Sequence, residues 1–147
     1  MKNHTIQITL LSALLLLCIS GRAQTASNAP PSKSAKSDAK AGAARKVDAN
    51  EFEKLWQQKT NIVLDVRTPK EFAAGHIPGA VNVDINAPDF TQKISALKKD
   101  KTYLVHCAAG GRSARACEKM NDLGFQHLVD LAPGFKGWEK AGKPVEK

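Results

Sequence analysis

The residues best suited to chemistry in this chain lie together between His106 and Ser113, in the string His-Cys-Ala-Ala-Gly-Gly-Arg-Ser. The cysteine, Cys107, directly follows an apolar run, 102–105, that predicts a buried strand, and it precedes a helical pattern over 113–123. At such a turn, free backbone N–H groups and the positive end of the helix dipole favour the thiolate, the nucleophilic form of cysteine. The string therefore predicts sulfur or phosphorus chemistry at Cys107.

Ordered elements must hold this loop, and apolar runs alternate with helical patterns from residue 48 onward. Capping-box strings at Asp48–Glu51 and Thr68–Glu71 each predict the start of a helix. We expect strands at 62–65, 80–83, 102–105 and 127–131, and further helices from Pro88, over 113–123 and over 135–141. This alternation predicts an α/β fold with a small central parallel β-sheet and helices on both faces. Ligands of such sheets bind beyond the carboxyl ends of the strands, where Cys107 falls.

The first residues, 1–23, have the pattern of a secretory signal peptide. Lys2 supplies the positive start, 6–19 is the apolar segment, and Gly21–Ala23 offers small residues where a signal peptidase would cleave, after Ala23. The apolar segment is shorter than the roughly 20 residues that a membrane span needs. We therefore expect an exported protein, periplasmic or secreted, without a stable membrane span after processing. The alternative is an N-terminal anchor that stays uncleaved.

Composition divides the rest of the chain into two parts. Residues 24–46 are rich in Ala, Ser, Lys, Pro and Gly and contain no large apolar side chain, which predicts a flexible tether. Residues 47–147 are enough for one small domain. The formal charge of +8 comes mostly from the first two segments, because 47–147 holds 15 basic and 13 acidic side chains. Without a basic face on the folded part, we expect no nucleic-acid partner.

Two cysteines, Cys107 and Cys117, remain after the expected cleavage. They make neither a disulfide framework nor the spacing of a zinc site, so we expect no metal. Cys117 falls on the inner face of the helical pattern after the loop. We interpret it as a small buried side chain rather than a second reactive thiol.

Three segments in this order resemble the single-domain rhodanese-like sulfurtransferases, here in an exported form. The first is Leu64-Asp65-Val66-Arg67, Glu71-Phe72 and Gly75-His76-Ile77-Pro78-Gly79-Ala80 with Asn82; the second is Cys107 to Ser113; the third runs from Leu131 through Gly134 to Trp138 and Ala141-Gly142. The resemblance covers essentially all of 47–147. It implies that a cysteine accepts a sulfane sulfur from thiosulfate or a related donor and passes it, as a persulfide, to a thiol or cyanide. No metal or organic cofactor is implied.

Loop length distinguishes this activity from phosphoryl chemistry. Cysteine phosphatases, including those on a rhodanese-like fold, surround phosphate with Cys-x5-Arg, whereas Cys107 and Arg112 form the shorter Cys-x4-Arg. A tighter ring suits one sulfur atom, so sulfur transfer is favoured over a phosphatase or arsenate reductase. A sulfur carrier or interaction domain serving one partner protein stays open. A thiol oxidoreductase using Cys107 and Cys117 is disfavoured, because the loop and helix should hold the sulfurs too far apart.

The predicted site follows from the loop. Cys107 is the nucleophile, and backbone N–H groups around it would hold the persulfide charge. The residues expected to bind persulfide or substrate are Ala108, Ala109, Gly110, Gly111, Arg112 and Ser113. Arg112 has two interpretations: it holds the sulfonate of the donor, or it orders the loop by pairing with Asp65 or Glu71. Ser113 is expected to be the helix N-cap, with a further chance of bonding the sulfur.

Neighbouring side chains are expected to support the site. Asp65 and Arg67 close the first apolar strand and are more consistent with scaffold than with catalysis. The side chain of His106 should point away from Cys107, because successive residues of a strand alternate. His76 should satisfy backbone groups in its turn.

The family's commoner pattern is not kept everywhere. Relatives often carry a basic or polar side chain just after the cysteine, whereas Ala108 and Ala109 are bare. Side-chain recognition of the donor must then come from Arg112 or elsewhere. Pro133 stands where a glycine is usual and is expected to stiffen that rim of the site. Nothing in the residues indicates an oligomeric state.

Overall fold

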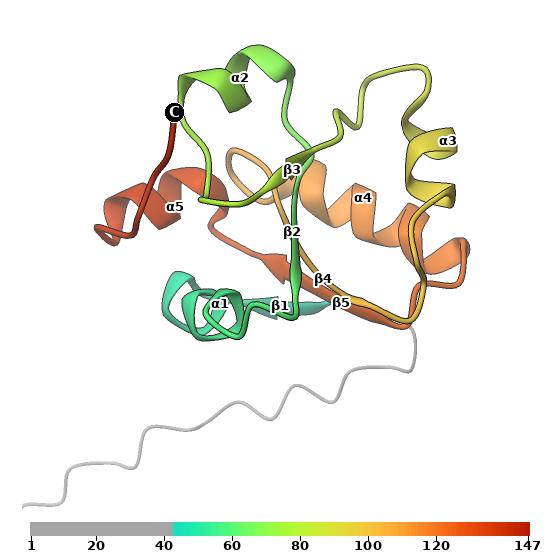
Figure 1. The fold of residues 1–147 in the computed structure, drawn as a ribbon, viewed down its shortest axis with the longest axis horizontal. Helices are drawn as coiled ribbons and strands as arrows, with labels where there is room; N and C mark the ends of the chain where they lie inside the picture. The colour runs from blue at the N-terminus through green and yellow to red at the C-terminus, as the bar shows by residue number, and fades with distance from the viewer. Residues whose placement is uncertain (1–42) are drawn as a thin grey trace, which may run out of the picture. The chain divides into compact units, whose positions relative to one another are not determined.

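The computed structural model describes residues 43–147; the expected signal peptide, and the tether as far as residue 42, lie outside them. Helices and strands alternate along the described chain (Figure 1). They are β1 (Arg45–Val47), α1 (Ala49–Trp56), β2 (Ile62–Asp65), α2 (Pro69–Ala74), β3 (Val81–Asn82), α3 (Phe90–Ser95), β4 (Thr102–His106), α4 (Gly111–Asp122), β5 (His127–Leu131) and α5 (Gly134–Lys140). Every element expected from the apolar patterns is present, with ends that differ by a few residues.

The strands form one parallel sheet in the order β1-β5-β4-β2-β3, which confirms the expected parallel sheet. The central strand β4 carries the loop. Its register with β2 pairs Asp65 with His106, so the carboxyl ends of the two strands lie side by side. The segments that follow these strands therefore meet at one edge of the sheet, as expected for a parallel sheet.

The edge strand β1 was not expected from the sequence. Its Lys46 pairs with Asp130 and its Val47 with Leu131 of β5. The folded part of the chain therefore includes Arg45 and Lys46, which we had assigned to the tether of residues 24–46. Two of the three residues of β1 are charged, so no apolar pattern marks it, and it forms because β5 offers a free edge and the core accepts Val47.

Helices cover both faces of the sheet, as predicted, and each face has its own apolar core. On one face, α3 and α4 contribute Phe90, Ile94, Ala116, Cys117 and Met120 to a cluster with Tyr103 and Val105. On the other, α1 and α5 contribute Phe52, Phe135 and Trp138 to a cluster with Val63 and Leu104. Burying these side chains is the main stabilisation of the fold. Within residues 43–147, the helices are all too short or too polar to cross a bilayer.

Candidate active site

The loop between β4 and α4 differs in one detail from the expectation. Gly110 precedes α4 with φ of 89°, and the helix begins at Gly111 rather than at Ser113. Ser113 lies inside the first turn, and its hydroxyl donates to the carbonyl of Gly110 at 3.1 Å. Its predicted role as N-cap is therefore wrong. The cause is the left-handed conformation of Gly110, which lets the chain turn into the helix early.

Cys107 lies at the bottom of this loop with 2% of its surface exposed. The backbone N–H of Gly110 donates to Sγ at 3.2 Å. Burial raises the pKa of the Cys107 thiol, but the Ser113 hydroxyl and the N–H groups of Ser113, Ala109 and Gly110 outweigh burial and bring the pKa below its usual value. The loop thus favours the thiolate, in the direction expected for a nucleophile.

Glycines let the loop lie directly on the segment before α5. A Cβ at Gly110 would lie 2.2 Å from the carbonyl oxygen of Ala132. A Cβ at Gly134, where φ is 62°, would lie 2.5 Å from the nitrogen of Ala109. Both distances are far below van der Waals contact, so only glycine fits at these two positions without moving the loop.

The first turn of α5 anchors the loop by backbone hydrogen bonds. The N–H of Phe135 donates to the carbonyl of Cys107 at 2.7 Å, and the N–H of Lys136 donates to that of Ala108 at 3.1 Å. Free N–H groups at a helix start need acceptors, and here the loop supplies them. The position of Cys107 is therefore determined by α5 as well as by β4 and α4.

Arg112 forms a two-pronged ion pair with Glu71 of α2, with both N···O distances at 2.7 Å. This is the loop-ordering pair, one of the two expected roles, with Glu71 rather than Asp65 as the partner. The hydrogen bond from Arg112 lowers the pKa of Glu71 to about 2, helped by the Thr68 capping box and opposed by burial. Donor binding by Arg112 stays a prediction.

Asp65 and Arg67 form a buried pair at the end of β2. Nε and Nη2 of Arg67 donate to the Asp65 carboxylate at 2.6–3.0 Å, and Nη2 also donates to the carbonyl of Gly75 at 2.7 Å. The guanidinium lies over the ring of Phe135, 4.1 Å from its centre. The pair therefore links β2, the end of α2 and α5, which is the arrangement expected of supporting residues.

The two histidines near the site occupy structural positions. His106 is fully buried against Phe52 and Phe135, on the face opposite the α4 core that holds Cys107. Its ring nitrogens have no hydrogen-bond partner within residues 43–147, and burial lowers its pKa to about 4. His76 stacks on Phe72 and its Nδ1 lies 3.1 Å from the carbonyl of that residue.

Cys117 and Asp130 lie on the α4 face of the sheet, near Cys107. Cys117 is buried, and burial, with the negative charge of Asp130 adding to it, raises its pKa. It packs in the core, as expected. Asp130 of β5 was missed by the sequence analysis, although a charged residue inside the apolar run 127–131 was a usable signal. It is 2% exposed.

A cavity of about 260 Å³ opens beside the loop. Its lining includes Ala108 from the loop, Phe135 as an apolar wall, and charged side chains of both signs. These charged residues are Arg67, Glu71, Lys136 and Glu139. Lys136 and Glu139 were not singled out from the sequence, because the chain alone does not show which exposed charges of a helix face a cavity.

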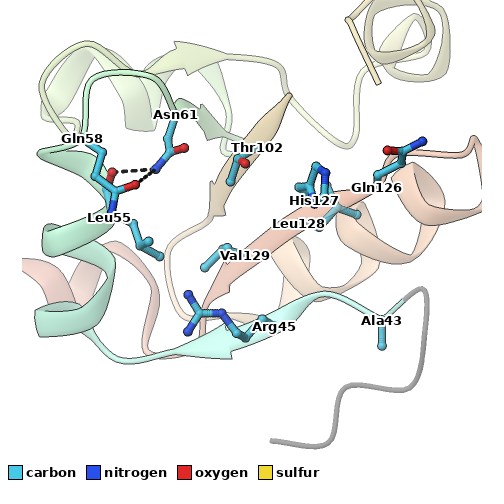
Figure 2. Close-up of a pocket in the computed structure, with 10 residues that line it drawn as sticks. All are labelled: Ala43, Arg45, Leu55, Gln58, Asn61, Thr102, Gln126, His127, Leu128 and Val129. Atoms are coloured by element: carbon cyan, nitrogen blue, oxygen red, sulfur yellow. Dashed lines mark hydrogen bonds between the residues drawn. The ribbon is translucent and has the colours of Figure 1, made fainter. Parts of the chain in front are cut away.

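A second cavity, of about 330 Å³, lies at the other end of the strands (Figure 2). It is lined by Thr102 and His127, where β4 and β5 begin, and by Gln58 and Asn61 after α1. Figure 2 shows the Asn61 amide donating to Gln58 and to the carbonyl of Leu55. This cavity is larger, but Cys107 follows the opposite end of β4, so the cavity does not belong to the loop's chemistry.

No group of three or more His, Cys, Asp or Glu side chains within residues 43–147 is arranged to hold a metal ion. That the protein needs no metal or organic cofactor stays a prediction.

The fold and the loop together define a class: a small α/β domain with a buried cysteine in a glycine-containing loop at the carboxyl end of a parallel sheet. Comparison with known families narrows this class. The sequence model described as Rhodanese-like domain matches residues 48–141, and the chain belongs to that family.

Relatives with sulfurtransferase names support a transferase. Thiosulfate sulfurtransferase 16, chloroplastic, from Arabidopsis thaliana is 36% identical over 93 residues, which span 56% of this chain and 78% of that protein. The putative sulfurtransferase YtwF of Bacillus subtilis is 35% identical over 92 residues, 63% of this chain and 86% of that protein. Protein HIGH ARSENIC CONTENT 1, mitochondrial, from Arabidopsis thaliana is 36% identical over 94 residues, 57% of this chain and 56% of that longer protein.

Solved structures agree on the fold. A crystal structure of a rhodanese-related protein from Thermoplasma volcanium has 36% identity and a TM-score of 0.62, covering 69% of this chain and 97% of that one. A solution structure of a rhodanese-like domain from Anabaena has 29% identity and the same TM-score of 0.62, covering 69% and 77%.

Proposed function

We propose that this protein moves a sulfane sulfur from thiosulfate or a related donor to a thiol or cyanide acceptor through a persulfide on Cys107. The observation that carries the proposal is the environment of Sγ: a buried cysteine whose pKa is lowered by N–H and hydroxyl donors, in a Cys-x4-Arg loop. Donors aimed at a fixed position stabilise a negative sulfur without reorganising.

The reaction has two balanced steps. The Cys107 thiolate attacks the outer sulfur of thiosulfate; a new S–S bond forms, the bond to the sulfonate sulfur breaks, and sulfite leaves with that electron pair. The terminal persulfide sulfur then carries the negative charge within reach of the loop's N–H groups. An acceptor thiolate or cyanide attacks the terminal sulfur, and Cys107 leaves as thiolate. No external oxidant or reductant is needed.

The cavity beside Ala108 is the proposed entry for the donor. Arg112 is held by Glu71, and Arg67 is held by Asp65, so neither guanidinium is free to turn toward a new anion at no cost. Lys136 is exposed and lines the cavity, and its backbone N–H already bonds Ala108. Its ammonium group is the proposed contact for the sulfonate, in place of the side chain that Ala108 and Ala109 lack.

The proposed setting is outside the cytoplasm, since residues 1–23 have the pattern of a signal peptide. Cell fractionation tests this directly. Recovery of the protein in the periplasm or medium, beginning at Gln24, is expected; an intact N-terminus in the cytoplasm would contradict export.

A second candidate, arsenate chemistry, is favoured by one observation. A relative of similar identity carries the name HIGH ARSENIC CONTENT 1, mitochondrial. The short loop argues for sulfur transfer, so arsenate belongs in the same assay as a competing substrate rather than in place of thiosulfate.

Mass spectrometry after incubation with thiosulfate tests the proposal. One added sulfur on the Cys107 peptide is expected, with its loss on adding cyanide or a thiol. Cys107→Ser should abolish both the mass gain and turnover, while Cys117→Ala, which changes the other buried cysteine, should retain them. Turnover of arsenate or an aryl phosphate without a persulfide would instead support the second candidate.

A further inference from the structure

The cavity beside Ala108 is lined by charges that are not all neutralised by the protein. Arg67 and Glu71 are held in the ion pairs described above. Lys136 and Glu139, which also line the cavity, are exposed and form no ion pair within residues 43–147. A ligand in this cavity therefore meets both an ammonium group and a carboxylate with which it can pair.

Helix α5 positions these two groups beside the loop. Lys136 and Glu139 are three residues apart, so they lie on the same side of the helix, about one turn from each other. The start of the helix is fixed against the loop, because the N–H of Lys136 donates to the carbonyl of Ala108 at 3.1 Å. Ala108 directly follows Cys107. The two charges therefore flank a cavity whose wall is one residue away from the nucleophile.

The cavity has a size that suits a small metabolite. Its volume of about 260 Å³ is below the roughly 300–1,000 Å³ of pockets that hold drug-sized ligands. The ring of Phe135 forms an apolar wall, and Ala74 and Gly75 at the end of α2 add no polar side chain. A matching ligand has a short apolar body that carries one positive and one negative group.

These properties are those of a free amino-acid thiol. Its carboxylate suits Lys136, its ammonium group suits Glu139, and its carbon chain suits the ring of Phe135. We propose that the sulfur acceptor is a free amino-acid thiol carrying both charges, and that Glu139 selects it. A thiol with only a carboxylate is repelled by Glu139, and a cysteine inside a protein has neither charge at its α-carbon. The inference rests on the proposed function, because it takes the Cys107 persulfide as the source of sulfur.

Transfer to this acceptor needs no other reactant. The acceptor thiolate attacks the terminal sulfur of the persulfide, and a new S–S bond forms. The bond between that sulfur and Cys107 breaks, and Cys107 leaves with the electron pair as thiolate. Lys136, the proposed contact for the donor's sulfonate, is free for the acceptor's carboxylate at this stage, because sulfite has already left.

Four thiols that differ in these charges test the proposal. L-cysteine carries both charges, cysteamine only the ammonium group, 3-mercaptopropionate only the carboxylate, and N-acetylcysteinamide neither. The persulfide-loaded protein is separated from its sulfur source and mixed with each thiol, and sulfur loss from the Cys107 peptide is followed by mass spectrometry. Rates are compared per thiolate, since the thiols ionise to different extents. Exposed ion pairs are weak, so we expect each charge to contribute about threefold and L-cysteine to react about tenfold faster than N-acetylcysteinamide.

Substitutions of the two charged residues assign each preference. Glu139→Gln should slow transfer to L-cysteine and cysteamine about threefold and leave N-acetylcysteinamide unchanged, whereas Lys136→Gln should slow L-cysteine and 3-mercaptopropionate about threefold. Glu118→Gln and Lys140→Gln make the same charge changes outside the cavity and should alter none of the ratios. Equal rates for all four thiols, or ratios that Glu139→Gln does not change, would overturn the proposal. Fastest transfer to N-acetylcysteinamide would also overturn it and would indicate a protein-bound cysteine as acceptor.

Loading the protein in parallel with thiosulfate and with inorganic polysulfide separates this proposal from the proposed function. Loading by polysulfide alone would contradict thiosulfate as donor and would still measure the choice of acceptor. Failure of both to add sulfur to Cys107 would contradict sulfur transfer and the acceptor with it. Loading by either, followed by transfer without a charge preference, would contradict the acceptor alone.

Discussion

Replacing Glu71 by glutamine decides between the two roles of Arg112. The structure shows the guanidinium bound to Glu71 through two hydrogen bonds of 2.7 Å, which link the loop to α2. The glutamine side chain keeps the size of the original and removes its charge. If Arg112 orders the loop, the variant should lower kcat several-fold with little change in the KM for thiosulfate. If Arg112 instead serves the donor, its release from Glu71 should lower KM.

The expected loss of unfolding free energy in Glu71→Gln follows from the pKa of the Glu71 carboxyl. Its pKa is lowered from 4.5 to about 2, first by the hydrogen bond from Arg112. For a fully buried pair this would correspond to roughly 3 kcal/mol. The side chains of Arg112 and Glu71 are 22% and 35% exposed, however, so solvent screens the pair and we expect Glu71→Gln to cost about 1 kcal/mol of unfolding free energy.

The pH dependence gives this pair a signature. Because the folded-state pKa of Glu71 is depressed, its stabilisation is complete above pH 4.5 and is lost as the pH falls toward 2. Urea unfolding at pH 7 and near pH 2.5 should therefore separate wild type from variant at the higher pH and bring them together at the lower one. Equal stability at pH 7 together with unchanged kcat and KM would refute the reasoning.

Three other substitutions test the walls of the site. Gly134→Ala should lower the unfolding free energy by roughly 2 kcal/mol and slow persulfide formation, because its Cβ would lie about 2.5 Å from the backbone of the loop. The control is Gly142→Ala, which also has a positive φ but has open space around its Cβ, so it should lower stability without changing persulfide formation. Lys136→Glu should raise the KM for thiosulfate about tenfold, whereas the same change at Lys140, outside the cavity, should not. In the wild-type protein, the unfolding free energy should fall by roughly 3 kcal/mol as the pH drops from 6.5 to 4, because the unfolded chain takes up a proton at His106 while the buried ring stays neutral. His106→Leu should abolish this acid-dependent fall.

Each of these has an outcome that contradicts it. Equal persulfide rates in Gly134→Ala and Gly142→Ala would show that the loop tolerates displacement. Equal KM values for the variants at Lys136 and Lys140 would leave donor recognition to another group. An unchanged slope of unfolding free energy against pH in His106→Leu would mean that His106 already finds a proton acceptor in the fold.

The place of Cys107 could be predicted because every signal for it is local. An uninterrupted apolar run makes β4, two glycines follow, and a helical pattern comes next. Strand β1 could not be predicted in this way. Two of its three residues are charged, so no apolar pattern marks it. It forms by pairing with β5, which lies near the other end of the described chain. Local periodicity does not encode such a long-range pairing.

The sequence alone could not decide whether Arg112 pairs with Asp65 or with Glu71, because that choice also depends on long-range contacts. Asp65 and Glu71 both lie near the loop once β2 and β4 pair, one at the end of β2 and the other in the helix that follows. The structure resolves the choice through a shorter-range contact. Arg67, two residues from Asp65, occupies both oxygens of that carboxylate and leaves Glu71 for Arg112. Arg67 thus pairs with Asp65, which is close to it in the sequence, and Arg112 pairs with Glu71, which the fold brings to it.

The loop that carries Cys107 is held in place by contacts from several elements. Cys107 is bound through its carbonyl to Phe135, its neighbour Gly110 donates to the sulfur, and Arg112 is tied to α2. These contacts come from separate elements and none of them requires a bound substrate. In the proposed reaction, the N–H groups would therefore already be in position when negative charge forms on the terminal sulfur, which is the condition under which fixed donors accelerate a reaction. The proposal assigns recognition of the donor to side chains outside the loop, and Lys136, which lines the cavity beside Ala108, is the one we propose.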